Sequence, residues 1–316
     1  MKGSTTEKPR PQWSIIVPLY NKQDFIVATL QSVLGQVGAG DFEIVVVDDG
    51  SRDQGPARVI ALGDPRIRLI RQANAGVSAA RNNGVRASVG TWILFLDADD
   101  LLHPQALAAL GDIAARFPEA KVLAGSYVRV SDRQVSGYRF APHPISVEFR
   151  EIRDLPGEIL RAGMVFYTSS IAISREYFGS FETWFPEGES LGEDLDFWLR
   201  LAETSPIQFG SYCIALYRVD LPSSLSSSRV FDRLFPYLER LEERARTGKV
   251  PTRLVWSSLK LVADARVSMA RESIRRGRRW AAPGLLFLAW RRVASIRWWF
   301  TWAAVLSPGL LRWRER

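Results

Sequence analysis

Three carboxylates directly follow a strongly apolar run in the segment WILFLDADDLLHP. Asp97, Asp99 and Asp100 stand within four positions, and like charges this close cost free energy unless a cation or a hydrogen-bond donor offsets them. Mg²⁺ or Mn²⁺ is a natural compensator, because such an ion combines one or two carboxylates with water and phosphate oxygens. An Asp-x-Asp pair therefore suits a metal that is bridged to a diphosphate. The alternative is that one of the three carboxylates caps a helix or closes a turn.

A second pair of carboxylates, Asp48 and Asp49, ends the apolar run of FEIVVVDDGS. Alone, this pair is equally well explained as part of a turn. A cation comes from the alanine-rich helical segment GVSAARNNG, in which Arg81 follows Ser78, a candidate N-cap. A helix start with an arginine can bind a phosphate, although an arginine on a solvated helix face is the ordinary alternative.

The apolar runs predict β-strands, and the segments between them have the period of helices. The runs are continuous rather than alternating, as in strands covered on both faces, so we expect an α/β fold with a mostly parallel central sheet. In such sheets ligands bind at the carboxyl ends of the strands, where the polar side chains gather here. The expected strands are 13–20, 42–51, 67–72, 91–100, 120–130 and 207–219, with a strand and a helix start in 163–178; the expected helices are 24–36, 76–88, 104–117 and 192–204.

The helix expected over 192–204 begins with three carboxylates, Glu193, Asp194 and Asp196. Acidic side chains in a first turn suit the helix dipole, so these residues are first interpreted as N-terminal charges. Trp198 on the same helix belongs either to the core or to the lining of a binding pocket.

Composition narrows the class of protein. Of the 316 residues, 47% are hydrophobic and 24% charged, which predicts a folded chain of one large domain or two ordinary ones. Cys213 is the only cysteine, which excludes an intramolecular disulfide and a cysteine-based zinc site and fits a reducing compartment. Residues 1–12 lack the apolar core of a secretion signal, and we expect a disordered lead-in there.

Charge divides the chain after the Pro- and Ser-rich loop 220–228. Residues 229–316 hold 20 Lys and Arg against 7 Asp and Glu, a net charge of +13, and seven of the eleven tryptophans. We expect an amphipathic helical extension here. Arginines interrupt its apolar part, 284–316, whose longest clear run is too short to cross a bilayer, so we expect helices that lie at a membrane surface. Packing on the body of the protein is the alternative, and nucleic-acid binding is not expected, because no recognised motif accompanies the basic residues.

Five motifs occur in an order and at spacings that resemble one enzyme family. They are IVPLYNK, EIVVVDDGSRD, NAGVSAARNNG, LFLDADD and GEDLDFWLRL. Together they are similar to the inverting glycosyltransferases of family 2, which have the GT-A fold. The resemblance implies a GT-A domain at 13–228, with a nucleotide-sugar-binding half at 13–130 and an acceptor half at 131–228. The basic tail would then be residues 229–316.

The resemblance assigns donor binding to Pro18, Tyr20, Asp49, Arg81 and Asp97. Pro18 and Tyr20 would cradle the nucleotide base and ribose, and Asp49 would bind the base. Arg81 would lie near the base and phosphates, and Asp97 would contact the donor.

The resemblance assigns metal binding and catalysis to other carboxylates. Asp99 would bind Mg²⁺ or Mn²⁺, with Asp100 in support. Asp194 would be the general base that takes a proton from the acceptor hydroxyl, with Glu193 in support. Asp220 stands where family members often have a histidine near the metal and phosphates, so we expect either Asp220 or water to take that place.

The implied reaction moves a sugar from a nucleotide diphosphate to a hydroxyl of a glycan or lipid-linked acceptor, with inversion, at the cytoplasmic face of the cell membrane. The Gln-x-x-Arg-Trp signature of processive synthases is absent, which favours a single addition. A sugar-phosphate nucleotidyltransferase is one alternative, but VPLYNKQDF lacks the glycine-rich loop of such enzymes. The other is a non-catalytic domain that binds a nucleotide sugar or a membrane partner.

Overall fold

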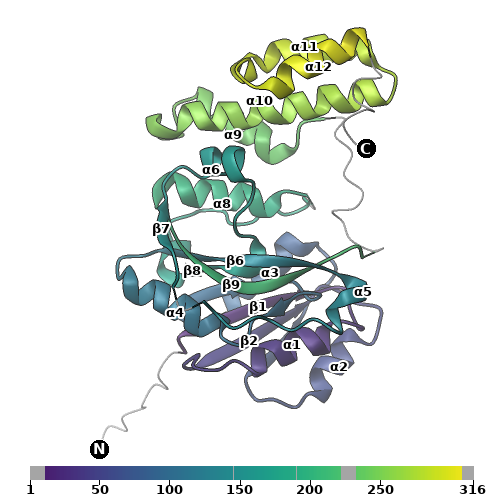
Figure 1. Cartoon of the computed structure of the whole chain (residues 1–316). Coiled ribbons are helices and arrows are strands. Elements are labelled where there is room, and N and C mark those ends of the chain that lie inside the picture. The colour runs from purple at the N-terminus through teal and green to yellow at the C-terminus, as the bar shows by residue number, and fades with distance from the viewer. Residues whose placement is uncertain (1–10, 145, 190, 222–232, 308–316) are drawn as a thin grey trace, which may run out of the picture. The chain divides into compact units, whose positions relative to one another are not determined.

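The computed structural model describes residues 11–144, 146–189, 191–221 and 233–307 (Figure 1). Most of the predicted lead-in, the predicted boundary at 228 and the last nine residues of the predicted tail lie outside the described residues. The chain forms two compact units. Unit 1 comprises Met1–Ile152, Val165–Ser190 and Ser205–Ser224, and unit 2 comprises Arg153–Met164, Leu191–Thr204 and Leu225–Arg316. This division groups two helical segments from the middle of the chain with the C-terminal helices, whereas the predicted domain boundaries do not.

Unit 1 is built on a mixed sheet with the strand order β3-β2-β1-β4-β8-β6-β9-β5, and β7 pairs with β9. Most of the paired residues lie in parallel ladders, which join β1 to β2 and β4, β2 to β3, and β6 to β9. Among the strands of the described residues, antiparallel pairing is confined to the ladders of β5, β7 and β8. The predicted α/β fold with a mostly parallel central sheet is therefore confirmed. The strands are β1 Trp13–Leu19, β2 Phe42–Asp48, β3 Ile67–Arg71, β4 Trp92–Phe95, β5 Leu101–Leu102, β6 Val122–Ser131, β7 Phe149–Ile152, β8 Ile171–Ser174 and β9 Ile207–Val219.

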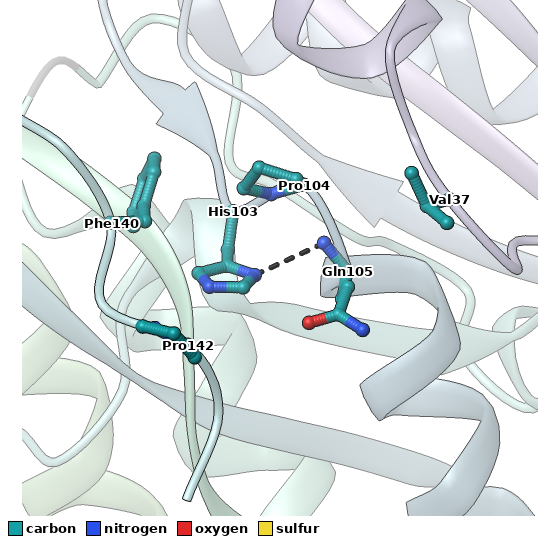
Figure 2. Close-up of a pocket in the computed structure, with 6 residues that line it drawn as sticks. All are labelled: Val37, His103, Pro104, Gln105, Phe140 and Pro142. Carbon is teal, nitrogen blue, oxygen red and sulfur yellow. Dashed lines mark hydrogen bonds between the residues drawn. The ribbon is translucent and has the colours of Figure 1, made fainter.

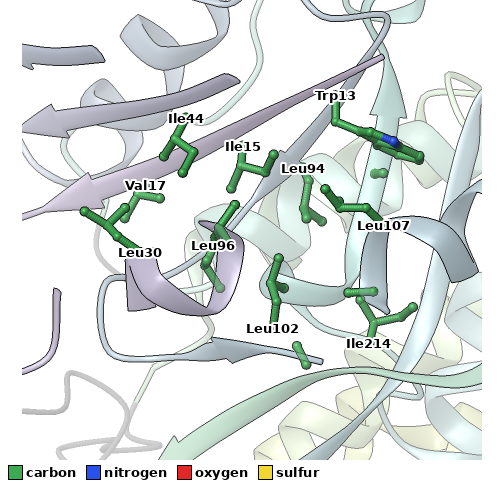
Figure 3. Packing of buried hydrophobic residues seen from close by; sticks show 14 of the residues in the cluster. Trp13, Ile15, Val17, Leu30, Ile44, Leu94, Leu96, Leu102, Leu107 and Ile214 are labelled. Carbon is green, nitrogen blue, oxygen red and sulfur yellow. The ribbon is translucent and has the colours of Figure 1, made fainter. Parts of the chain in front are cut away.

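Helices cover both faces of this sheet. On one face, Ile15 and Val17 of β1 lie in a core with Leu30 and Leu107 (Figure 3). On the other face Ile16 packs so closely on a helix that a Cβ added to Gly84 would lie 2.3 Å from its Cγ2. Alternate side chains of a strand point to opposite faces, so burial on both faces explains the continuous apolar runs. The helices of unit 1 are α1 Ile26–Leu34, α2 Gly55–Ala61, α3 Val77–Ala87, α4 Ala106–Arg116, α5 Asp132–Val135 and α7 Arg175–Phe178, with the 3₁₀ turn η1 Thr168–Ser170.

Helix α3 starts differently from the prediction. Its N-cap is Gly76, whose φ of +91° favours glycine, and Ser78 lies buried inside the first turn. No side chain caps this helix. The prediction that Ser78 is the cap is wrong, because the backbone freedom of a glycine starts the helix.

Unit 2 is helical. Its longest helix, α10, spans Thr252–Arg275 and contacts α6, α9, α11 and α12. Among the residues that the structure describes, no helix combines the length and the apolar character needed to cross a membrane. The other elements are α6 Leu155–Ala162, α8 Glu193–Thr204, α9 Pro236–Arg246, η3 Arg279–Ala281, α11 Ala282–Leu288, η4 Trp290–Arg292 and α12 Ile296–Leu306.

Candidate active site

The carboxyl ends of β1, β2 and β4 lie side by side at one edge of unit 1. The parallel register pairs Leu19 with the last residue of β2 and Ile16 with the last residue of β4. The backbone N–H of Asp49 donates to the carbonyl oxygen of Leu19 over 2.8 Å. The Lys22 ammonium donates to Asp99 over 2.6 Å, which joins the loop after β1 to the loop after β4. We call this edge, with the loops that follow the three strands, the rim.

Two carboxylates of the rim carry counterions from the chain itself. Arg81 Nη2 lies 2.9 Å from Asp97 Oδ1, and Lys22 Nζ contacts Asp99 Oδ2. The side chains of Asp97 and Asp99 remain 31% and 18% exposed, whereas that of Arg81 is buried beside the ring of Phe185. Arg81 is therefore not the solvated arginine of the ordinary alternative. The spacing of these carboxylates predicts a divalent ion that offsets their mutual repulsion. In the structure, Arg81 and Lys22 offset it.

Asp100 has a different environment. It is fully buried, and its carboxylate accepts hydrogen bonds from Tyr167 Oη at 2.7 Å, Ser169 Oγ at 2.8 Å and the backbone N–H of Arg218 at 3.0 Å. Burial, and then the charges of Asp99 and Asp97, hold the pKa of Asp100 well above its usual value. Asp100 is thus the structural member of the three, and it fastens the loop after β4 to β9.

Asp48 and Asp49, at the end of β2, also differ from each other in their contacts. Asp48 Oδ1 accepts from the backbone N–H of Ser51 over 2.9 Å, which closes a turn. Asp49 is buried and accepts three hydrogen bonds of 2.8 Å, from Gln72 Nε2 and from the backbone N–H groups of Ala75 and Gly76. A carboxylate offers about four acceptor sites, so few remain for a nucleobase. Asp49 also positions the loop that leads into α3, the helix of Arg81.

The end of β1 presents an aromatic ring to solvent. Tyr20 is 44% exposed, and Pro18 is partly buried within the strand. Asn21 has a φ of +50°, and its side-chain oxygen accepts from the backbone N–H of Arg52 over 2.8 Å. The loops after β1 and β2 are thereby joined beside Tyr20, and the stacking roles of Tyr20 and Pro18 stay predictions.

Several residues that hold the rim were not singled out from the sequence. Arg218 also donates from Nε to the carbonyl oxygen of Asp99 over 2.8 Å and from Nη1 to Asp132 over 2.7 Å. Lys22 lies within the motif IVPLYNK, and Arg218 lies two residues before Asp220. Asp220, two residues further on, is exposed and has a φ of +64°. Its predicted role near the phosphates remains a prediction.

The predicted catalytic base lies in unit 2. Asp194 is half-buried in the first turn of α8, and its carboxylate accepts from the backbone N–H of Leu195 over 2.7 Å. Glu193 beside it is buried. Asp196 is buried with an arginine Nε at 2.8 Å from each of its oxygens, and Trp198 is fully buried. These contacts assign Asp196 and Trp198 to the core of unit 2, and the role of Asp194 stays a prediction.

A cavity of about 310 Å³ lies elsewhere in unit 1 (Figure 2). His103 lines it, with Nε2 3.0 Å from the carbonyl oxygen of Ala141 and Nδ1 accepting from the backbone N–H of Gln105. Both ring nitrogens are thus engaged by the backbone, and we assign this cavity no role. Its lining residues are Val37, His103, Pro104, Gln105, Phe140 and Pro142.

The oxygen donors of Asp97 and Asp99 suit a hard divalent ion that completes its shell with water and phosphate. Both carboxylates are partly exposed and come from one short loop. Within residues 11–144, 146–189, 191–221 and 233–307, no group of three or more His, Cys, Asp or Glu side chains is arranged to hold a metal.

Comparison with known proteins identifies the family. Residues 14–178 match the family described as Glycosyl transferase family 2. The uncharacterized glycosyltransferase EpsJ of Bacillus subtilis is 41% identical over 126 residues, which cover 39% of this chain and 36% of that protein. The succinoglycan biosynthesis protein ExoO of Rhizobium meliloti is 40% identical over 126 residues, which cover 40% of this chain and 34% of that protein. The matched region thus spans about a third of the length of these relatives.

The fold is shared with a solved structure, S. aureus TarS 1-349 in complex with UDP-GlcNAc. The TM-score is 0.62 at 20% sequence identity, and the match covers 84% of this chain and 73% of that chain. Since the family model spans more than half of the sequence, the protein belongs to glycosyl transferase family 2.

Proposed function

We propose that the protein transfers a sugar from a nucleotide-diphosphate donor to a hydroxyl of a glycan or lipid-linked acceptor, with inversion at the anomeric carbon. The observation that carries the proposal is the rim, where Asp97 and Asp99 meet Arg81 and Lys22 at the ends of parallel strands. The name of ExoO supports a polysaccharide product, and the TarS complex makes UDP-sugars the first donors to test.

On the donor side, each residue has a task that its contacts support. The exposed ring of Tyr20 offers a face on which a nucleobase can stack. Asp49 positions the loop before α3 and keeps an acceptor site for the base. The buried Arg81 guanidinium holds Asp97, which contacts the donor sugar, and supplies positive charge for the phosphates.

We also propose that Asp99 helps to hold Mg²⁺ or Mn²⁺ with the donor diphosphate. When bound, the ion offsets charge on the departing diphosphate. Lys22 contacts Asp99 Oδ2, so this ammonium competes with the ion for that oxygen.

Asp194 takes the proton from the acceptor hydroxyl in this proposal. A carboxylate within hydrogen-bond reach makes the hydroxyl oxygen a better nucleophile. That oxygen attacks the anomeric carbon from the face opposite the diphosphate, which breaks the bond to the diphosphate and inverts the centre.

The test is a screen of UDP-sugars with Mn²⁺, in which release of nucleoside diphosphate is measured. Asp194→Asn should abolish release while donor binding, measured by calorimetry, stays unchanged. The matched control is Asp112→Asn, which alters an exposed carboxylate on α4 and should leave release unchanged.

Each other outcome has a definite meaning. Release of pyrophosphate from a sugar phosphate and a nucleoside triphosphate would instead show a nucleotidyltransferase. Donor binding without any turnover would favour the non-catalytic alternative. Normal release by Asp194→Asn would show that Asp194 is not the base.

A further inference from the structure

Helix α12 in unit 2 leaves large apolar side chains exposed, whereas its two polar side chains have partners within unit 2. Arg297 donates to Asp264 and to Ser268, both over 2.9 Å, and Thr301 is fully buried. These are the two polar residues of the helix. A surface helix of a soluble protein usually presents polar side chains, rather than large apolar ones, to water.

The exposed side of α12 continues onto α11 and the turns beside it. Both helices lie beside α10 and contact it (Figure 1). Their buried residues, such as Leu286 and Ala304, form a core with Val267. The large side chains that they leave outside are between 39% and 81% exposed, and a monomeric soluble protein rarely exposes so many together. We call these residues the apolar face: Trp280, Phe287, Leu288, Trp290, Val293, Ile296, Trp299, Phe300 and Leu306.

Positive charge accompanies the apolar face. The sequence from Arg275 to Ser307 contains seven arginines and no acidic residue. Two of these guanidinium groups lie over tryptophans of the face, with Arg291 4.4 Å from the ring centroid of Trp290 and Arg279 4.7 Å from that of Trp280. Tryptophan and arginine side by side are typical of helices at the headgroup level, where the ring enters the interface and the cation meets lipid phosphates.

We propose that the apolar face binds the surface of an anionic lipid bilayer, with α11 and α12 lying in the plane of the interface. Four of the seven arginines pair with Glu272 or Asp264 of α10, which leaves Arg278, Arg279 and Arg291. A second copy of the chain fits less well, because it would bring these three arginines of each copy together with no acidic residue between Arg275 and Ser307 to pair them. Anionic lipids supply negative charge for Arg279 and Arg291 beside the apolar face. The proposal concerns where the protein resides and is independent of the proposed transfer reaction.

Vesicle flotation of the full chain tests the proposal. The protein should float with vesicles of phosphatidylcholine mixed with phosphatidylglycerol and bind vesicles of phosphatidylcholine alone far more weakly. The double variant Phe287→Glu/Trp299→Glu should lower the partition coefficient by about tenfold or more, because two large apolar side chains no longer enter the interface. The matched control is Val37→Glu/Ile60→Glu in unit 1, where both side chains are 61% exposed and binding should not change.

We expect both variants to fold, because the replaced side chains are exposed. Circular dichroism and thermal unfolding check this. Equal binding to both kinds of vesicle would overturn the role of anionic lipid, and equal loss in both variants would overturn the assignment to this face. A dimer in light scattering that Phe287→Glu/Trp299→Glu dissociates, together with no flotation, would show that a second copy covers the face. Flotation is measured without donor and diphosphate release without lipid, so the two proposals fail independently.

Discussion

Replacing Asp100 with alanine removes the carboxylate that joins the loop after β4 to β9. Three donors would lose their acceptor: the hydroxyls of Tyr167 and Ser169 and the backbone N–H of Arg218. The Ser169 oxygen can move by rotation of its side chain and donate elsewhere, whereas the phenolic oxygen of Tyr167 and the backbone nitrogen of Arg218 have no such freedom of position. We therefore expect two buried donors to remain unsatisfied.

The magnitude follows from these contacts. Each unsatisfied buried donor costs about 1–3 kcal/mol, which gives about 2–6 kcal/mol for two. Part of this is recovered, because burial and the charges of Asp99 and Asp97 disfavour an ionised Asp100. We expect Asp100→Ala to lower the free energy of unfolding by about 3 kcal/mol. Asp100→Asn keeps the shape and one carbonyl oxygen, so we expect a loss of only about 1 kcal/mol.

Urea denaturation followed by circular dichroism at neutral pH measures both variants. Asp112→Ala, at an exposed position on α4, is the control and should change stability by less than about 0.5 kcal/mol. If Asp100→Ala falls within that same margin, the structural role of Asp100 is refuted. A larger loss for asparagine than for alanine would refute the hydrogen-bond reasoning.

Two further predictions concern a cation and a thiol. Lys22→Met removes the ammonium that contacts Asp99; because such partly exposed ion pairs contribute about 1 kcal/mol, Mn²⁺ affinity in the presence of UDP should rise about fivefold. Electron paramagnetic resonance measures free Mn²⁺, Lys121→Met is the control, and an unchanged affinity would contradict the competition. Burial raises the pKa of the Cys213 thiol, so the thiolate fraction at neutral pH is lower than for a free thiol and grows as pH rises through that pKa. Intact-protein mass spectrometry measures the rate at which iodoacetamide alkylates Cys213. This rate should be lower than the rate for glutathione at pH 7 and should rise at higher pH. Equal rates at pH 7 would show an exposed, unperturbed thiol.

The strands of the rim could be predicted because a strand buried on both faces appears in the sequence as an unbroken apolar run. Trp13–Leu19 and Phe42–Asp48 are recognisable in this way without any three-dimensional information. An apolar run does not indicate whether the strand pairs in parallel or antiparallel. The segment 163–178 predicts a strand, which the structure has at Ile171–Ser174, but its antiparallel insertion between β4 and β6 depends on contacts distant in sequence.

The different environments of Asp97, Asp99 and Asp100 could not be predicted, because the three residues are identical in type and nearly adjacent. Their environments are set by partners far along the chain, such as Lys22 and Arg218. Helix α12 poses the same difficulty. Its composition indicates an apolar helix, but only the ion pair of Arg297 with Asp264 shows that this arginine is joined to α10.

The ion pairs of Lys22 and Arg81 affect how the protein behaves when metal ions are removed during purification. Asp97 and Asp99 already have cationic partners within the chain, so we expect the protein to fold without a bound metal ion. Small zinc domains differ, because they fold only when the metal binds. Material stripped with EDTA should keep its melting temperature. If the proposed metal site exists, Mg²⁺ and Mn²⁺ can then be added separately to folded protein, and the affinity for each ion compared.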